Sequence, residues 1–314
     1  MPESEIVTRS LALESPDARE RRRAWLAIGS AALVLTLGFV LCFSWHWASL
    51  WWLWTSDPLR SIGMAIPVAS LVLAIRAWRV RDFSRGGTWW GLPLVLVAAI
   101  LALLTSAAPL VLRFHIYHSP GVNLIPEGLL LSAYASGVVL LFGGPHTWRR
   151  AWFPLLLLIC VNPVPGFFNS LVDLPLQYFA SHAARGFAAL IGVPVSQGTL
   201  RMMFTPHLGM FIAPGCDGMR GAVTMGYLAL VIGYLYRLRW FRWGVYVVAA
   251  IALAYVFNVV RLCGVVGYYW FAMRFSMIAD HGTLADYLIG GILFFCAALF
   301  LFSVPRWWRN KPCT

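Results

Sequence analysis

A cysteine and an arginine stand where an apolar segment begins, in the run Cys216-Asp217-Gly218-Met219-Arg220. Pro214-Gly215 directly before them ends the preceding segment, so Cys216 is expected at or near a helix N-terminus. The unpaired N–H groups and the dipole at such an end favour a thiolate and lower the pKa of the thiol. Arg220 is expected on the same helical face, four residues later, where its charge acts in the same direction. Cys216 is therefore a candidate nucleophile, weighed against a buried structural cysteine at a tight turn.

Two more polar groups stand at the ends of apolar segments. Asn258 and Arg261 lie three residues apart, deep in one apolar run, and share a helical face. His281 lies just before the next apolar run. A cysteine and a histidine can form a nucleophile–base pair, and an arginine can stabilise the oxyanion of a tetrahedral intermediate. Cys216, Arg261 and His281 are therefore the candidate catalytic residues, and the chemistry they support is acyl transfer or peptide-bond cleavage.

The elements that must position these residues are membrane helices. The 314 residues are 60% hydrophobic and 11% charged, whereas an average soluble domain is about 25% charged. This composition excludes a cytosolic enzyme and a disulfide-stapled secreted module. We predict an all-α, polytopic transmembrane bundle of about eight spanning helices. The apolar runs that predict these helices are residues 24–44, 61–78, 88–112, 126–142, 151–166, 216–236, 243–271 and 283–304.

The basic residues indicate an orientation for this bundle. With the N-terminus in the cytoplasm, alternation of the helices puts 17 of the 24 basic residues on the cytoplasmic side, as the positive-inside rule requires. Both termini are then cytoplasmic, with tails at residues 1–23 and 305–314 and a single bundle at residues 24–304. The net charge of +12 is interpreted as an orientation signal, so no nucleic acid partner is expected. The candidate catalytic residues all fall at the outer face, on the periplasmic side of an inner membrane.

The outer-face segment 162–213 has an expected structure of its own. Asn162-Pro163 should end the fifth helix, because proline cannot continue it. Residues 167–190 are expected to form an amphipathic helix along the interface. Its apolar side is predicted to carry Leu171, Leu174, Tyr178 and Phe179. Gly192-Val193-Pro194 should end this helix, and residues 200–211 are expected to be extended.

No metal or cofactor site is expected. The histidines lack an HExxH or other ligand spacing, and the sequence has no glycine-rich phosphate loop. A histidine outside the clusters described above, such as His46, is expected at the surface. Glu127 and Asp286 stand near helix ends, where each is interpreted either as lining a substrate groove or as an interfacial residue.

The order Cys-x-Gly-x-Arg, Asn-x-x-Arg and His-Gly, each at the outer end of a helix, resembles the exosortase/archaeosortase family. The resemblance covers about residues 160–300, the expected catalytic half, and includes Asn162-Pro163-Val164-Pro165. It implies a membrane-embedded cysteine transpeptidase with Cys216 as nucleophile, Arg261 as the stabilising arginine and His281 as the acid/base. The implied substrates are membrane-anchored proteins with a C-terminal sorting signal: a motif such as Pro-Glu-Pro, a spanning helix and a basic cluster. Their acyl group would pass through a thioester to a cell-envelope acceptor.

One position departs from the family pattern. Asp217 stands where the family usually has a small residue between the cysteine and the glycine. An adjacent carboxylate disfavours a thiolate, so we expect Asp217 to pair with Arg220 or to point away from the thiol. Asn258 is expected to orient Arg261. Asp217, Arg220 and Asn258 are therefore expected to support the catalytic residues.

Other functions stay open from the sequence. One is a polytopic transporter, in which intramembrane charged residues line a path. Another is a membrane acyltransferase of envelope polysaccharide biogenesis that depends on His281 alone, and a third is a structural assembly subunit. The variant Cys216→Ala distinguishes these functions from a cysteine transpeptidase, because the transporter and the His-dependent acyltransferase should tolerate the loss of the thiol.

Overall fold

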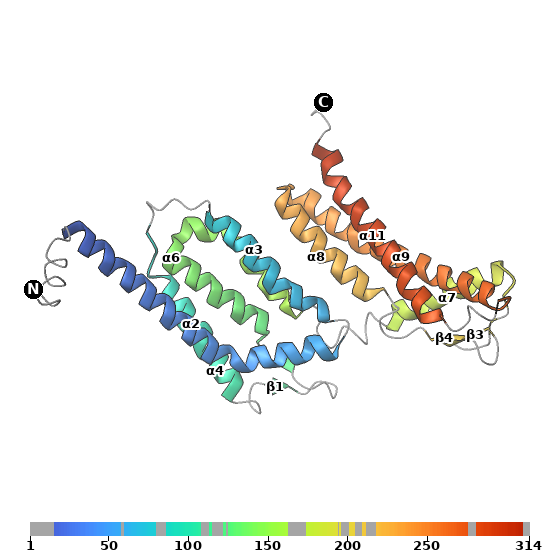
Figure 1. Cartoon of the computed structure of the whole chain (residues 1–314), viewed down its shortest axis with the longest axis horizontal. Coiled ribbons are helices and arrows are strands. Elements are labelled where there is room, and N and C mark those ends of the chain that lie inside the picture. The colour runs from blue at the N-terminus through green and yellow to red at the C-terminus, as the bar shows by residue number, and fades with distance from the viewer. Residues whose placement is uncertain are drawn as a thin grey trace, which may run out of the picture. The chain divides into compact units, whose positions relative to one another are not determined.

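Eight α-helices dominate the part of the chain that the computed structural model describes, and short 3-10 helices and strands connect them (Figure 1). The described residues are 16–57, 60–79, 86–107, 113–114, 122–123, 125–162, 174–193, 195, 201–204, 209–211, 218–275 and 281–309. The α-helices are α2 (Pro16–Ser56), α3 (Ala65–Arg79), α4 (Gly91–Ala107), α6 (Glu127–Leu157), α7 (Leu174–Leu190), α8 (Met219–Leu235), α9 (Trp240–Ala272) and α11 (Gly282–Arg309). The shorter elements are η1 (Ser61–Met64), η2 (Leu158–Val161), β1 (Arg113–Phe114), β2 (Val122–Asn123), β3 (Arg201–Met203) and β4 (Gly209–Phe211).

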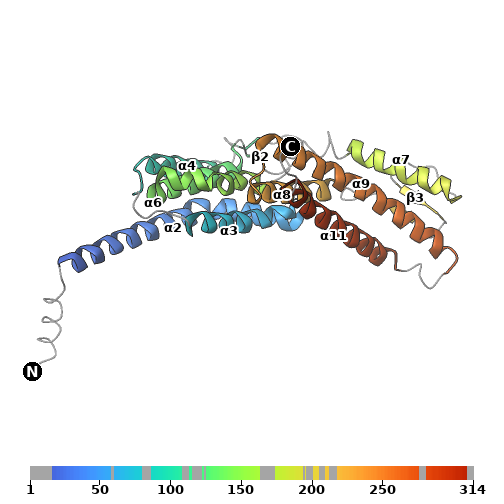
Figure 2. The same ribbon diagram turned by 90° about the horizontal axis from the view of Figure 1, so that it is seen from above.

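The chain divides into two compact units. The first contains residues 1–51, 69–114 and 123–159, and the second contains residues 52–68, 115–122 and 160–314. In the first unit α4 packs against α6. In the second unit α9 contacts α7, α8 and α11, and it runs alongside α11 in both views (Figures 1 and 2). The candidate catalytic residues all belong to the second unit.

Five helical segments within the described residues are long and apolar enough to cross a membrane. They are Trp25–Ser56, Ser61–Arg79, Glu127–Val161, Trp240–Ala272 and Gly282–Pro305. Two shorter apolar helices, Gly91–Ser106 and Met219–Leu235, add to these. A multi-pass, all-α membrane protein is therefore confirmed, while the count of eight spans and the side on which each terminus lies stay predictions.

The first helix is longer than the sequence suggested. Its end was expected near Ser44, before a cluster of tryptophans that resembles an interface, but α2 continues to Ser56. Neither glycine nor proline occurs between Val40 and Ser56, so nothing in the backbone stops the helix there. Near its end, Trp54 donates a hydrogen bond from Nε1 to the carbonyl oxygen of Val161 at 3.1 Å.

His46 lies in this additional helical stretch, and its expected surface position is wrong. The residue is only 1% exposed. Its Nε2 lies 3.0 Å from Oγ1 of Thr105 and 3.1 Å from the carbonyl oxygen of Ala102, both on α4. His46 therefore serves as a polar contact between α2 and α4 inside the first unit.

The fourth and fifth expected helices both lie within α6, which turns back on itself at Gly144, so that a β-carbon at Gly128 would lie 2.4 Å from the carbonyl oxygen of Ile159. Gly144 has φ 70° and ψ 178°, and Pro145 follows it. A β-carbon at Gly144 would lie 2.7 Å from the carbonyl oxygen of Gly86, so glycine is required by both conformation and space. The expected break between residues 142 and 151 is thus present as a tight turn between two helices that lie side by side. The expected end at Asn162 is confirmed, because η2 stops at Val161.

The amphipathic helix of the outer-face segment is present as α7, while residues 167–173 lie outside the described residues. The side with Leu174, Tyr178 and Phe179 is exposed, as expected for a helix that meets lipid. The opposite side carries Gln177 and the small residues Ala180, Ser181, Ala184 and Ala188, and α7 packs against α9. The expected stop is confirmed, because Gly192 has φ 72° and the N–H of Val193 bonds the carbonyl oxygen of Ala188 at 2.9 Å.

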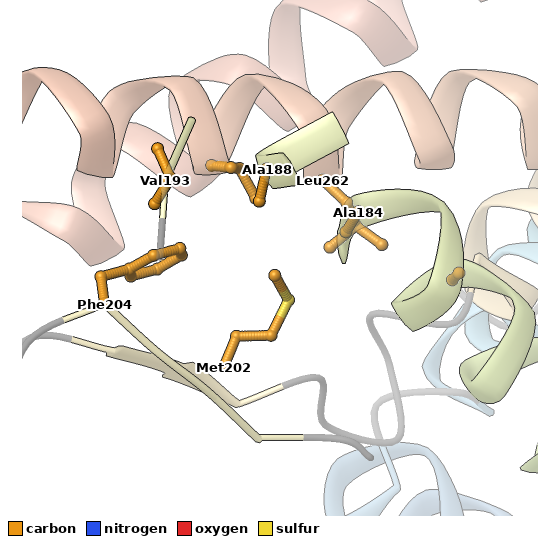
Figure 3. Close-up of a cluster of buried hydrophobic side chains, with 8 residues drawn as sticks. Ala184, Ala188, Val193, Met202, Phe204 and Leu262 are labelled. Carbon is orange, nitrogen blue, oxygen red and sulfur yellow. The ribbon is translucent and has the colours of Figure 1, made fainter. Parts of the chain in front are cut away.

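The expected extended stretch contains a β-hairpin, in which β3 pairs antiparallel with β4. Side chains from β3, α7 and α9 form a buried apolar cluster (Figure 3). Its labelled members are Ala184, Ala188, Val193, Met202, Phe204 and Leu262. Alanines on α7 leave room for Met202, which is fully buried. The hairpin is thereby held against the helix that carries Asn258 and Arg261.

Candidate active site

The start of α8 lies directly against Asn258 of α9. Gly218 is the N-cap residue of α8, with φ 89° and ψ −6°, and its carbonyl oxygen accepts the N–H of Ala222 at 2.8 Å. An ideal β-carbon on Gly218 would lie 3.0 Å from both Cβ and Nδ2 of Asn258. Asn258 is 8% exposed, so a polar amide is buried where the two helices meet. Glycine at position 218 thus permits both the left-handed turn and the close approach.

Cys216 and Asp217 lie outside the described residues, so the structure does not place the candidate nucleophile. Arg220 is described and is exposed in the first turn of α8. The helix α8 begins at Met219. That Cys216 and Arg220 share a helical face stays a prediction, because it concerns a residue outside the described part of the chain.

Arg261 pairs with Asp286 between α9 and α11. Nε of Arg261 lies 3.2 Å from Oδ1 of Asp286, and both atoms are shielded from solvent. The contact is an ion pair without the alignment of a hydrogen bond. Asp286, which the sequence placed either in a substrate groove or at the interface, faces the candidate oxyanion-stabilising residue. Asn258 and Arg261 both lie on the packed side of α9, as their spacing predicted.

His281 stands at the beginning of α11, on the helix that carries Asp286. Its side chain is exposed, and its carbonyl oxygen accepts the N–H of Ala285 at 3.0 Å. The next residue, Gly282, is tightly packed, because an added β-carbon would lie 2.5 Å from the hydroxyl oxygen of Tyr269 on α9. The His281-Gly282 pair is therefore held against α9 by a contact that only glycine permits.

Sequence reasoning missed Tyr269. Its ring stacks on Phe204 with 5.2 Å between centroids, while its hydroxyl group meets α11 at Gly282. Tyr269 thus joins the hairpin, α9 and α11 at the end of the unit that carries His281. The spacing of eight residues from Arg261 was the available signal, since two turns of a helix return to about the same face.

Glu127 lies in the first unit and is 6% exposed at the start of α6. Its burial excludes the simple interfacial reading. The other residues discussed above, from Gly218 to Asp286, belong to the second unit.

The starts of α8 and α11 thus both contact α9. The sequence model of the transmembrane exosortase family matches residues 51–304. The chain belongs to the transmembrane exosortase family. The match includes Cys216, Arg261 and His281, and the exosortase resemblance of the sequence is thus confirmed. No curated protein and no solved structure gives a significant match to this exosortase.

Family membership supports a membrane transpeptidase-type role for this exosortase in general. It fits the apolar helices of a multi-pass membrane protein.

Proposed function

We propose that this exosortase is a cysteine transpeptidase of the inner membrane with its active site at the periplasmic face. It would cleave membrane-anchored proteins at a C-terminal sorting signal and transfer them to a cell-envelope acceptor. One observation supports this most strongly. Gly218, two residues after Cys216, packs on Asn258, which lies one helical turn before Arg261.

Chain connectivity keeps the candidate nucleophile near this junction. Consecutive Cα atoms are 3.8 Å apart, so the Cα atoms of Cys216 and Gly218 are at most about 7.6 Å from each other. Under this proposal the thiol would act at the end of the helix pair where Gly218 meets Asn258. The N–H groups at the start of α8 and the guanidinium of Arg261 would both favour a thiolate there.

The proposed reaction begins with attack on the scissile peptide. The Cys216 thiolate forms a C–S bond to the carbonyl carbon, and the negative charge moves to the oxygen. Arg261 donates N–H groups to this oxyanion, a role in which one donor contributes about 10²–10³-fold in rate. The C–N bond then breaks, and His281 protonates the departing amine. The product is an acyl-enzyme held through a thioester.

The second half-reaction resolves this thioester. His281, now neutral, accepts a proton from a nucleophilic group of the envelope acceptor, which attacks the thioester carbon. The C–S bond breaks, and Cys216 leaves as the thiolate. The exposure of His281 suits this step, because an acceptor must approach from outside the bundle. Water in place of the acceptor would give hydrolysis with the same residues.

The test is direct trapping of the acyl-enzyme. The full-length protein in membranes is mixed with a peptide that carries a Pro-Glu-Pro motif, a spanning helix and a basic tail. Intact-mass measurement is expected to find the acyl fragment on wild-type protein and not on Cys216→Ala. Cys263→Ala is the matched control, because Cys263 is half-buried on α9 and is expected to leave the adduct unchanged.

An adduct that persists in Cys216→Ala would contradict the nucleophile assignment. If no adduct forms and Cys216→Ala still supports the cellular phenotype, the cysteine mechanism is wrong. The transporter and the His-dependent acyltransferase would then explain the chain better.

A further inference from the structure

We propose that Asp286 is a positioning residue that holds the guanidinium of Arg261 for the reaction. This role rests on the proposed function, because it needs Arg261 to face an oxyanion. The observation that carries it is the 3.2 Å contact between Nε of Arg261 and Oδ1 of Asp286. The sequence had left Asp286 either in a substrate groove or at the interface, with no connection to Arg261.

Two residues of α11, Asp286 and Gly290, lie close to the side chain of Arg261. An added β-carbon at Gly290 would lie 3.1 Å from Cδ of Arg261. Gly290 follows Asp286 by four residues, so both lie on one face of α11. The aliphatic stem of Arg261 therefore rests on Gly290 while Nε meets Asp286. A larger residue at position 290 would push the stem away.

The atoms used in this contact matter for catalysis. A guanidinium carries five N–H donors on three nitrogens in a rigid plane. The contact with Asp286 is at Nε, and in the proposed role the outer Nη groups face a second anionic oxygen. Asp286 would hold the guanidinium in place by its charge, without taking the donors that the oxyanion would need.

The same ion pair also ties the acid/base to the oxyanion donor. His281 and Asp286 are both at the start of α11, whereas Arg261 is on α9. The Arg261–Asp286 contact thus sets the spacing between the helix that carries the histidine and the helix that carries the arginine. A second contact, Tyr269 against Gly282, holds the same helix end independently. For this reason, α11 should stay docked when Asp286 loses its charge.

The experiment compares acylation rates of the full-length protein with the sorting-signal peptide described above. Asp286→Asn is expected to slow acylation by about 10–100-fold, since small misplacements of catalytic groups have effects of this size. The peptide concentration at half-maximal rate should stay unchanged, because Asp286 does not contact the peptide. Asp57→Asn is the matched control. Asp57 pairs with Nε of Arg60 at 3.3 Å and lies far from the candidate site residues in the sequence. Asp57→Asn should therefore leave the acylation rate unchanged.

A double-mutant cycle separates positioning from a structural role. If Asp286 acts through Arg261, Asp286→Asn will have no further effect on acylation in an Arg261→Ala protein. Two results would overturn the role: wild-type acylation in Asp286→Asn, or an equal additional loss in the Arg261→Ala background. Thermal unfolding of each variant confirms that it is folded.

An exchange variant covers the case in which Asp286→Asn does not fold. Arg261→Asp with Asp286→Arg restores an ion pair between α9 and α11 but moves the guanidinium to the wrong helix. We expect this protein to fold and to acylate as slowly as Arg261→Ala. Wild-type acylation by the exchange variant would show that the ion pair serves the fold alone, and the role of Asp286 would be rejected. Loss of the adduct in Cys216→Ala stays a separate readout, so failure of the positioning role is distinguishable from failure of the cysteine mechanism.

Discussion

Gly218 and Asn258 lie so close that an ideal β-carbon on the glycine would be 3.0 Å from Cβ and Nδ2 of the asparagine. The glycine precedes α8, and the asparagine lies within α9. Because the backbone of Gly218 is also left-handed, at φ 89°, the contact depends on a residue without a side chain. The start of α8 therefore lies against the buried amide of Asn258.

The first prediction concerns this glycine. We expect Gly218→Ala to lower the free energy of unfolding by about 1–3 kcal/mol, because a left-handed backbone is strained for alanine. Acylation should also fall, since the backbone of Gly218, two residues after Cys216, must move away from Asn258. Thermal unfolding in detergent and the peptide acylation assay measure the two effects.

Gly221→Ala is the control for this prediction. Gly221 lies one turn into α8 and has nothing within 4 Å of an added β-carbon. It should keep wild-type acylation and gain about 0.5–1 kcal/mol of stability from the better helix propensity. Equal behaviour of the two variants would contradict a special role for position 218.

A second prediction tests the contact between Tyr269 and Gly282. Gly282→Ala would put a β-carbon 2.5 Å from the Tyr269 hydroxyl oxygen. We expect a loss of about 1–3 kcal/mol from overpacking, together with slower acylation because the start of α11 carries His281. Adding Tyr269→Phe removes the clashing oxygen and should restore most of both losses. If Tyr269→Phe brings no recovery, the effect of Gly282→Ala has another origin.

The sequence was most informative where a local signal decides the backbone. Asn162-Pro163 and Gly192 mark real helix ends, because proline and a left-handed glycine act on their own neighbours. The end of α2 was misplaced because tryptophans near Ser44 were taken for a membrane interface. They carry no backbone signal, and the helix continued to Ser56.

The candidate site was less predictable, since it depends on contacts between helices. Spacing along α9 correctly put Asn258 and Arg261 on one side of the helix. No spacing rule connects Arg261 with Asp286, which is on another helix, because that contact depends on how α9 and α11 are rotated about their axes. The left-handed Gly218 likewise changed the start of α8 from residue 216 to Met219.

A third prediction addresses His281. In His281→Ala, we expect turnover to fall by about 10²–10⁴-fold, the usual contribution of general acid–base catalysis. The Cys216 adduct should outlive that of the wild type, because resolution of the thioester also needs a base. The exposed position of His281 predicts a stability change within about 0.5 kcal/mol. A time course of intact mass after peptide addition measures the lifetime of the adduct.

His182→Ala is the matched control for His281→Ala. His182 is also exposed, on α7 in the same unit, and is not near His281 in sequence. Its acylation and resolution rates should equal those of the wild type. A comparable loss in both histidine variants would indicate a general effect on the surface and not acid–base catalysis.

The last prediction tests the orientation in the membrane. Leu190 is the last residue of α7, in the segment expected on the periplasmic side, and is 86% exposed. Trp240 is the first residue of α9, beside basic residues expected on the cytoplasmic side, and is 84% exposed. The positive-inside rule puts the turn with Arg237, Arg239 and Arg242 in the cytoplasm and α7 on the other side of the membrane. A membrane-impermeant thiol reagent added to spheroplasts should therefore label Leu190→Cys. It should label Trp240→Cys only after the membrane is opened. The parent protein, with its native cysteines, gives the background labelling in each case. Labelling of Trp240→Cys but not Leu190→Cys in intact spheroplasts would place Cys216 and His281 in the cytoplasm and rule out an envelope acceptor.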